Sequence, residues 1–249
     1  MTKIKFGTDG WRAIIGNDYT VDNVARVTLA VSSWMKNKSK KSVVIGYDCR
    51  FGGKLFAETA CKVFASKGIL VKLSKDFVST PMVSFGILKE NADLGVVITA
   101  SHNPPTYNGY KLKGDFGGPL LPNDINEIEE MIPINNSIDL DSINFDTLLN
   151  NRKVKYVDFE DIYCKHIEAN FDLDSIRNSG INFAYDAMFG AGMNVIKKLL
   201  PETHLLHCEI NPGFLGIPPE PIHRNLGELS QLVKHNKIDC GLATDGDAD

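Results

Sequence analysis

The sequence predicts an α/β fold in which buried strands alternate with helices. Two observations carry this prediction. Short runs rich in Val and Ile recur along the chain, and longer segments with apolar residues at helical spacing lie between them. The connections are short, as they are in layered α/β proteins. Composition agrees, because 43% of the 249 residues are hydrophobic and 23% are charged, as in ordinary globular proteins.

The first part of the chain shows this alternation clearly. Apolar positions at helical spacing predict helices over residues 21–36 and 55–66. Short β-branched runs predict buried strands over residues 42–47, 69–73 and 94–99. The last of these strands leads directly into the most unusual loop of the sequence.

A loose segment with Pro and repeated Asn, residues 132–152, predicts a domain boundary near residue 152. We therefore expect one domain over residues 1–152 and a second over residues 153–249. The same alternation continues in the second domain, with helices predicted over 159–170, 190–200 and 226–235, and strands over 182–185, 203–208 and 239–243.

Charge and cysteine content argue against some classes of partner and of cysteine site. The formal net charge of −4 argues against nucleic acid or an anionic membrane as the main partner, although a local basic pocket for phosphate stays compatible with it. The chain has neither the apolar core of a secretory signal nor a run of about 20 apolar residues that could cross a bilayer, so we expect a cytoplasmic protein. The five scattered cysteines form no CxxC pair, which indicates reduced structural thiols.

Ser101 lies in the sequence TASHNP, just past a predicted buried strand, where α/β sheets usually bind ligands. The pairs Asn103–Pro104 and Asn108–Gly109 predict turns, and the second is a strong hairpin signal. A serine hydroxyl is a poor nucleophile unless a base or a cation assists it, and His102 and Lys111 are the nearby candidates. From the residues alone, an ordinary surface loop is an equal alternative.

Three carboxylates at alternate positions, Asp245, Asp247 and Asp249, follow the last predicted strand. Such close like charges repel one another unless a cation lies between them, and oxygen ligands suit Mg²⁺ or Ca²⁺. A solvated acidic loop is the main alternative. An EF-hand fits poorly, because its glycine comes sixth and a helix precedes its loop. Since the chain stops inside this apparent binding loop, we expect it to be a fragment of a longer protein.

Two further motifs are weaker. The opening FGTDGWR brackets a turn with glycines and ends in Arg12, which could clamp a phosphate, although a plain turn is the simpler interpretation. The segment DAMFGAGMN, residues 186–194, follows a strand and opens a helix. It lacks the third glycine of a dinucleotide-binding loop, so we predict a tight strand-to-helix turn there.

Taken together, these motifs resemble those of the α-D-phosphohexomutases, which include phosphoglucomutase and phosphomannomutase. TASHNP is similar to the phosphoserine loop of that family, residues 245–249 resemble its DGDxD metal loop, and FGTDGWR resembles its N-terminal active-site segment. DAMFGAG and the segment from Pro219 to Leu226 also fit, and all five occur in the family's order. The resemblance implies two consecutive three-layer α/β/α domains with mixed sheets, and it implies that the family's domains 3 and 4 are absent from this chain.

The resemblance also implies a metal-assisted phosphoserine. Ser101 would be the phosphorylated residue. Asp245, Asp247 and Asp249 would bind Mg²⁺ together with a phosphate oxygen on Ser101. Arg12 and Lys111 would assist proton transfer and stabilise charge at the reacting oxygen.

By the same resemblance, His102 would support the phosphoserine loop, and Asn103 would help to fix it. The chain departs from the family pattern at its end. The arginine that normally follows the third aspartate, the sugar-recognition loop and the distal phosphate-binding loop all lie beyond Asp249.

The activity implied by the resemblance moves a phosphoryl group between C1 and C6 of a hexose monophosphate, through a bisphosphate and with a glucose 1,6-bisphosphate-type activator. Phosphoglucomutase is the first expectation and phosphomannomutase the alternative, and we expect negligible turnover from these 249 residues alone. A non-catalytic Mg²⁺-binding chain is a second alternative. A serine hydrolase based on Ser101 and His102 is a third, but adjacent residues rarely face each other and no GxSxG elbow occurs.

Overall fold

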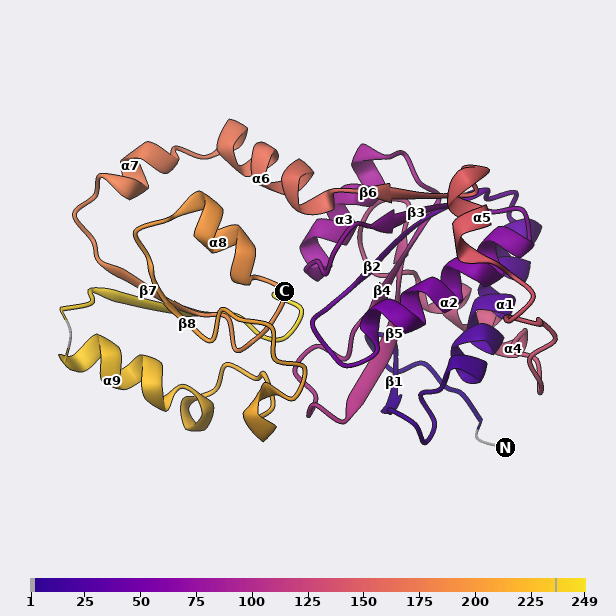
Figure 1. Cartoon of the computed structure of the whole chain (residues 1–249), viewed down its shortest axis with the longest axis horizontal. Helices are drawn as coiled ribbons and strands as arrows, with labels where there is room; N and C mark the ends of the chain where they lie inside the picture. The colour runs from indigo at the N-terminus through magenta and orange to yellow at the C-terminus, as the bar shows by residue number, and fades with distance from the viewer. Residues whose placement is uncertain (1–2, 236) are drawn as a thin grey trace.

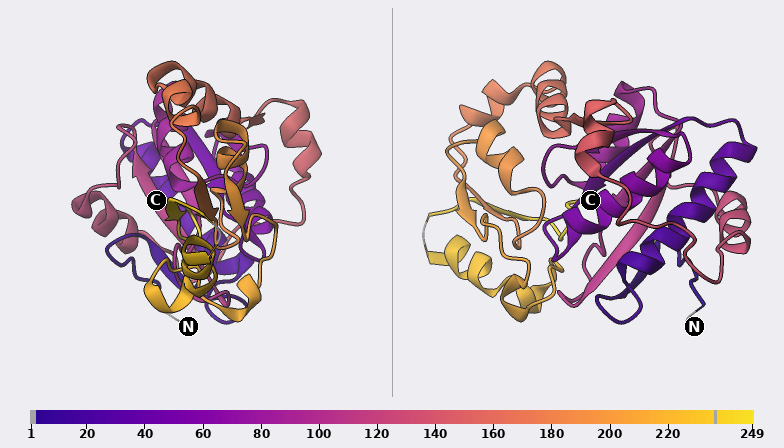
Figure 2. Two further views of the ribbon diagram at one scale, coloured as in Figure 1. Left: turned by 90° about the vertical axis from the view of Figure 1, so that its left-hand side faces the viewer. Right: turned by 45° about the vertical axis from the view of Figure 1, so that its right-hand side comes forward.

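The computed structural model describes residues 3–235 and 237–249. Its strands form two sheets, one of six strands and one of three, and helices flank both (Figure 1). The chain end, coloured yellow, lies between the two parts of the molecule in Figure 1, and in the right-hand view of Figure 2 its mark overlaps the ribbons of the larger part. The two α/β/α domains expected from the sequence are therefore confirmed.

The first sheet has the strand order β1-β5-β4-β2-β3-β6. The strands β2, β3, β4 and β6 run parallel, whereas β5 runs antiparallel to both of its neighbours. The sheet is thus mixed, as expected. Its strands are β1 (Trp11–Ile14), β2 (Ser42–Tyr47), β3 (Leu70–Ser74), β4 (Leu94–Ile98), β5 (Tyr107–Gly114) and β6 (Val154–Val157).

Helices bury both faces of this sheet, which explains its uninterrupted apolar strands. Successive residues of a strand point to opposite faces. Val43 and Ile45 of β2 accordingly join the core that contains the apolar residues of α1 and α2, and Val44 joins the core that contains those of α3. The helices of this part are α1 (Val21–Asn37), α2 (Gly53–Ser66), α3 (Thr80–Lys89), α4 (Pro122–Glu130) and α5 (Phe145–Asn150).

The second sheet has the order β8-β7-β9, and its three strands run parallel. Helix α8 lies on one side of it and α9 on the other (Figure 1). The strands are β7 (Phe183–Asp186), β8 (His204–Leu206) and β9 (Cys240–Ala243). The helices are α6 (Phe159–Asn170), α7 (Leu173–Arg177), α8 (Met193–Leu199) and α9 (Gly227–His235), with short 3-10 turns η1 (Phe214–Gly216) and η2 (His223–Asn225).

The boundary between the two domains was expected near residue 152, but the first sheet continues past it. Strand β6 (Val154–Val157) pairs with β3 through contacts such as Val71 with Val154. Asp158 then caps α6, because its side chain accepts a hydrogen bond from the Asp161 amide. We therefore propose that the boundary lies at Asp158.

The hairpin turn expected at Asn108–Gly109 is wrong, because these residues lie inside β5. The turn between β4 and β5 is formed instead by residues 99–106. Gly109 is needed for close packing, since a Cβ there would lie 2.4 Å from the Thr99 carbonyl oxygen and 2.8 Å from that of Trp11. Pairing on both sides of β5 thus overrides the local turn preference of Asn-Gly.

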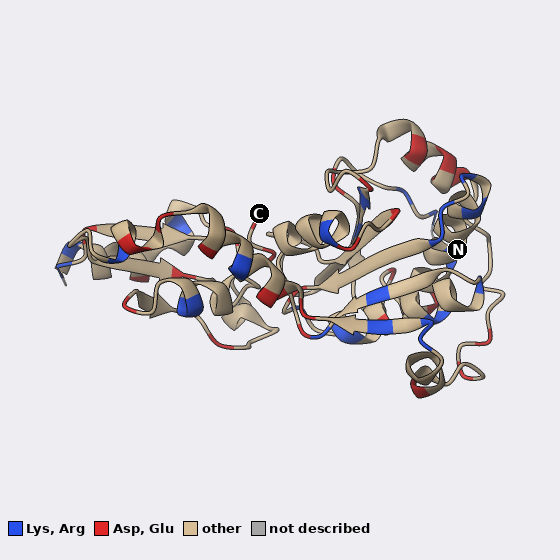
Figure 3. Ribbon diagram, turned by 90° about the horizontal axis from the view of Figure 1, so that it is seen from above, with Lys and Arg blue, Asp and Glu red and all other residues tan. Residues whose placement is uncertain are grey.

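Helix α3 was not expected from the sequence, although its start signals are present. Ser79 caps it by accepting a hydrogen bond from the Met82 amide, and Pro81 occupies its first turn. Acidic and basic residues are interspersed over both domains (Figure 3). Within the described ranges, no helix combines the length and apolar character that crossing a membrane would require.

Candidate functional site

The candidate site lies where two loops from different domains meet. The serine loop, residues 99–106, follows β4, and the acidic loop, residues 244–249, follows β9. Both leave the carboxyl ends of strands that pair in parallel with a neighbour, β4 with β2 and β9 with β7, and α/β sheets present their functional side chains at such ends. The Ser101 hydroxyl donates a hydrogen bond of 2.7 Å to Oδ2 of Asp245, so the two loops are in direct contact.

Ser101 is held in an unusual backbone conformation. It is buried, with φ at 53°, in the left-handed region that non-glycine residues rarely adopt. Its amide donates to Oγ1 of Thr99 at 2.9 Å, which satisfies the backbone within this tight turn. The side chain of the exposed His102 adds a contact of 3.3 Å from its Nδ1 to the serine Oγ. The structure thus orients the hydroxyl toward the acidic loop.

Arg12 reaches the serine loop from β1. Its Nη1 donates to Oδ1 of Asn103 at 2.7 Å, and its Nη2 donates to Asp9 at 3.3 Å. The backbone of Arg12 is paired with Gly109 of β5, which fixes the position of the guanidinium next to the loop. Arg12 is therefore linked directly to Asn103 of the serine loop, and the catalytic roles expected for these two residues stay predictions.

Lys111 projects from β5 into a group of carboxylates. Its Nζ lies 2.7 Å from Asp9, 2.8 Å from Asp247 and 3.1 Å from Asp249. The side chain is only 1% exposed. Burial opposes the positive charge of the ammonium, but Asp247 and Asp9 outweigh this effect and raise the pKa of Lys111 above its ordinary value. The surrounding carboxylates thus favour the protonated form of Lys111.

Asp247 is the most enclosed of the three acidic residues, with no exposed side-chain surface. The Thr80 hydroxyl and the Lys111 ammonium both donate to its Oδ2, while the Thr80 amide donates to its backbone oxygen at 2.9 Å. Burial alone would raise the pKa of Asp247, but Lys111 reverses the effect, and the pKa is lowered. Asp247 therefore stays ionised.

Asp245 has the opposite electrostatic character. Burial raises the pKa of Asp245 to about 6, and the negative charge of Asp247 adds to this effect. The hydrogen bond from Ser101 acts in the other direction but does not cancel it. The two carboxylates of one short loop thus differ in their affinity for a proton.

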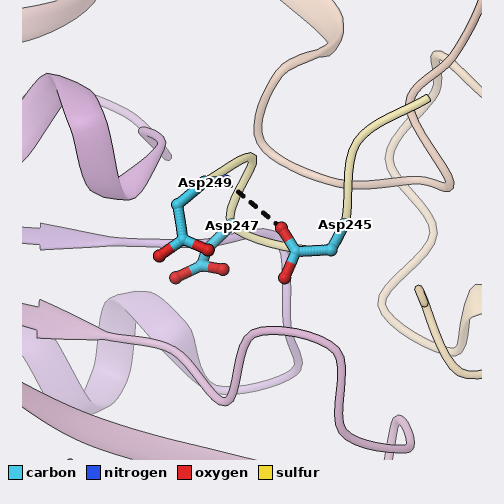
Figure 4. Close-up of side chains that lie close together, drawn as sticks. All are labelled: Asp245, Asp247 and Asp249. Carbon is cyan, nitrogen blue, oxygen red and sulfur yellow. Dashed lines mark hydrogen bonds between the residues drawn. The ribbon is translucent and has the colours of Figure 1, made fainter. Parts of the chain in front are cut away.

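The three acidic residues can bind a divalent cation. Figure 4 shows their side chains gathered within one turn of the loop, with the amide of Asp249 donating to Asp245 at 3.3 Å. One oxygen from each carboxylate can be chosen so that all lie within 4.8 Å of one another. Opposite oxygens around octahedral Mg²⁺ are about 4.2 Å apart, so a small contraction suffices.

A second observation supports such a site. Oδ1 of Asp247 is buried and has no hydrogen-bond partner among the described residues. A buried carboxylate oxygen without a partner is costly, and a cation would satisfy it. Carboxylates alone, without His or Cys, favour a hard ion such as Mg²⁺. An EF-hand is excluded, because strand β9 precedes the loop.

The segment DAMFGAG packs against the backbone of the acidic loop. The Ala191 amide donates to the Gly246 carbonyl at 3.0 Å, and a Cβ on Gly190 would lie 2.5 Å from the Asp245 carbonyl. The glycine is therefore required for close approach of two backbones. This agrees with the tight turn that the sequence predicts after β7, residues 183–186.

Three residues of this site were not anticipated. Asp9 links Arg12 and Lys111, Thr80 anchors Asp247, and Arg50 lies under the serine loop. Asp9 could have been found, because it stands between the two glycines of FGTDGWR. Thr80 begins α3, which the residue pattern did not predict, and nothing in its local sequence points to the acidic loop.

Comparison with known proteins agrees with the motifs. Residues 3–138 match the family described as phosphoglucomutase/phosphomannomutase, alpha/beta/alpha domain I, and residues 161–249 match its domain II. A probable phosphoglucosamine mutase of Methanosphaera stadtmanae is 34% identical over 98% of this chain and 53% of its own length. A phosphoglucomutase/phosphomannomutase of Thermococcus kodakarensis is 31% identical over the same shares.

Solved structures show the same relationship. A putative phosphomannomutase from Thermus thermophilus superimposes with a TM-score of 0.88 and 30% identity, over 99% of this chain and 56% of that protein. A phosphoglucomutase-like phosphoprotein from Paramecium shares the fold, with a TM-score of 0.83 and 23% identity over 100% of this chain and 52% of its own. The chain thus spans about half the length of the curated relatives it matches.

Proposed function

Because this chain belongs to the phosphoglucomutase/phosphomannomutase family, we propose that it is the phosphoryl-carrying half of a phosphosugar mutase, an isomerase that moves a phosphoryl group between C1 and C6 of a hexose monophosphate. The observation that carries the proposal is the 2.7 Å hydrogen bond between Ser101 and Asp245. It brings a candidate phosphoryl acceptor against a candidate metal site.

In the proposed reaction, the phosphoryl group on Ser101 passes to the free hydroxyl of a hexose monophosphate. The P–O bond to serine breaks, a P–O bond to the sugar forms, the sugar hydroxyl loses its proton, and the departing Ser101 oxygen takes one up. The resulting bisphosphate turns over in the site and returns its other phosphoryl group to Ser101. Phosphoryl transfer depends mainly on positioning and charge stabilisation, which suits a site with two fixed cations and several carboxylates.

Each site residue of this chain would have a distinct role in the proposed transfer. Lys111 and Arg12 would stabilise negative charge on the transferring group and assist proton transfer at the reacting oxygen. His102 would support the loop beside the serine Oγ. Mg²⁺ held by Asp245, Asp247 and Asp249 would neutralise charge on the phosphoryl group.

We propose a glucose phosphate as substrate, with glucose 1,6-bisphosphate as activator and mannose phosphate as the alternative substrate. Relatives with printed names of phosphoglucosamine mutase, phosphoglucomutase and phosphoglucomutase/phosphomannomutase all match this chain. Glucosamine phosphates therefore belong in the same assay. A cytoplasmic location stays a prediction from the sequence.

We also propose that turnover needs further domains that complete the cleft, the equivalents of domains 3 and 4. The chain covers 53% of the length of the relative from Methanosphaera stadtmanae. The family resemblance assigns sugar recognition and the distal phosphate contact to the remaining part. Alone, the 249 residues would bind Mg²⁺ and carry phosphate but show negligible mutase turnover. A non-catalytic Mg²⁺-binding chain is the second candidate, favoured by the Asp247 oxygen that has no hydrogen-bond partner in the described part of the chain.

The test combines intact mass and activity. The chain would be incubated with Mg²⁺ and glucose 1,6-bisphosphate, and phosphate on Ser101 would be located by peptide mass spectrometry. Ser101→Ala should lose this phosphate, whereas the control Ser137→Ala, at an exposed serine, should keep it. Mutase activity would be measured with the chain alone and joined to domains 3 and 4 of a relative. Activity that survives Ser101→Ala would refute the assignment.

A further inference from the structure

The buried guanidinium of Arg50 donates hydrogen bonds to the backbone of the serine loop. Its Nη2 donates to the carbonyl oxygens of Ser101 at 2.5 Å and Asn103 at 2.6 Å, and its Nη1 donates to those of Pro104 at 2.9 Å and Tyr107 at 3.0 Å. The residue is only 3% exposed. One guanidinium group therefore satisfies four carbonyl oxygens of a single turn.

The guanidinium forms a buried ion pair with Asp48, which follows β2. The Nε of Arg50 lies 3.2 Å from Oδ2 of Asp48, and neither side chain has exposed surface. The same Oδ2 accepts a hydrogen bond of 2.6 Å from the Thr99 hydroxyl, and that hydroxyl accepts from the Ser101 amide at 2.9 Å. Asp48 thus joins the arginine to the amide side of Ser101 as well as to its carbonyl side.

This arrangement matters because Ser101 adopts a φ of 53°. A left-handed serine persists only where the surrounding contacts determine it. The planar fork of Arg can donate to several carbonyl oxygens at fixed angles, whereas the flexible ammonium of Lys cannot reproduce that geometry. Arg50 is therefore well suited to hold the serine in the conformation that directs its hydroxyl to Asp245.

The opposite domain contacts the same guanidinium. The Arg50 Cζ lies 5.1 Å from the ring centroid of Phe214, within the range of a cation–π contact. Phe214 is 1% exposed and begins η1, where it and Leu215 have φ values of 46° and 51°. A strained segment of the second domain thus presents an aromatic ring to the arginine that holds the serine loop.

We propose that Arg50 is a positioning residue for Ser101, and that its contact with Phe214 makes the shape of the serine loop depend on how residues 211–217 of the second domain are seated. The relevance to catalysis rests on the proposed function. The clamp itself rests only on the contacts described above. The position of residues 211–217 would determine the orientation of the Ser101 hydroxyl. Loss of the Arg50 hydrogen bonds, or of the contact between Arg50 and Phe214, would make the serine loop more mobile.

The experiment is hydrogen–deuterium exchange of the 249-residue chain, compared among Arg50→Lys, Phe214→Leu and a matched control, Arg26→Lys. Arg26 is also buried, at 7% exposure, and donates to a backbone carbonyl, that of Pro133, which lies outside the site. In the serine loop, the amides of Ser101 and Asn103 are bonded at 2.9 Å and 3.0 Å and should exchange slowly in the wild-type protein.

We expect Arg50→Lys to speed exchange in residues 99–107 at least tenfold while β2, residues 42–47, keeps its protection. Phe214→Leu should speed exchange in the same loop by a smaller factor. Arg26→Lys should leave the loop unchanged. A role confined to core stability would instead raise exchange throughout the domain and would do so equally in the two arginine variants.

Loop exchange in Arg50→Lys that equals that of Arg26→Lys overturns the clamp. Unchanged loop exchange in Phe214→Leu overturns the link to the second domain. If Arg50→Lys does not fold, Phe214→Leu still tests the link to the second domain, because faster exchange of the serine loop in that variant requires that Phe214 influences the loop. Phosphate uptake at Ser101 from glucose 1,6-bisphosphate should be slower in Arg50→Lys. If the wild-type protein takes up none, the proposed function fails, whereas the exchange result still tests the clamp.

Discussion

The hydroxyl of Ser101 contacts the carboxylate of Asp245, although 144 positions separate the two residues in the chain. Both loops leave the carboxyl ends of strands in different sheets, so only the packing of the two domains brings them together. A nucleophile thereby meets a carboxylate whose neighbours can hold a cation. Four predictions test this arrangement from different directions.

Replacing Asp247 with Asn should abolish binding of Mg²⁺. The residue supplies the buried oxygen that has no hydrogen-bond partner among the described residues, and its charge is central to the cluster. In the wild-type protein, a metal concentration of about one hundred times Kd should add about 2.7 kcal/mol to the free energy of unfolding. Thermal unfolding with Mg²⁺ and with EDTA measures this gain. The exposed Asp141→Asn should keep it, and a normal gain in Asp247→Asn would contradict the metal assignment.

Affinity for Mg²⁺ should fall at acidic pH because of Asp245. Burial, with Asp247, raises the pKa of Asp245 to about 6. Below that pH the metal must displace a proton, so affinity should drop about tenfold between pH 7 and pH 5. Calorimetry in buffers of different ionisation enthalpy should detect proton release at pH 5 and almost none at pH 7.5. The same proton release in Asp245→Asn would show that another group is responsible.

Replacing Lys111 with Met should destabilise the metal-free protein by about 3 kcal/mol, because Asp247 would lose its buried counter-charge. Mg²⁺ should restore more stability to this variant than to the wild-type protein, since the cation replaces the missing positive charge. Urea unfolding with and without Mg²⁺ measures both effects. Lys165→Met, at a side chain that is 72% exposed, should change stability by less than about 0.5 kcal/mol. Equal losses in the two variants would argue against the buried charge cluster.

A methyl group on Gly246 should push the two loops apart. A Cβ there would lie 2.5 Å from the Ser101 carbonyl oxygen and 3.0 Å from Cγ of Pro219. Gly246→Ala should therefore cost about 1–3 kcal/mol of stability and reduce phosphate uptake at Ser101. Gly227→Ala is the control, because no atom of residues 3–235 and 237–249 beyond its own surroundings in the helix lies within 4 Å of a Cβ placed there. Unfolding midpoints and intact mass provide the measurements, and wild-type behaviour of Gly246→Ala would mean that the loops need not touch.

Much of the fold was readable in the sequence because its signals are local. The β-branched run at residues 42–47 coincides with β2, and the helical spacing from residue 21 matches α1 (Val21–Asn37). The Asn108–Gly109 pair was misinterpreted for the opposite reason. Its local preference is a turn, but β5 pairs with strands on both sides, and those bonds decide its conformation.

By itself, the sequence determined which residue types stand at the ends of the strands: a serine in a rigid turn after one strand and three alternate carboxylates after another. These patterns also carry the family membership. The chemistry of these motifs depends on residues that are neighbours in the sequence, so it can be recognised before the fold is known.

Only the tertiary structure decided which of these groups meet. The hydrogen bond from Thr80 to Asp247 joins residues that are 167 positions apart in the sequence, and the hydrogen bond from Arg50 to the Ser101 carbonyl joins residues that are 51 positions apart. Such partners are chosen by how sheets and domains pack, and no local pattern encodes that packing. The charge states of Lys111 and Asp245 have the same origin, because burial and neighbouring charges exist only after the two domains come together.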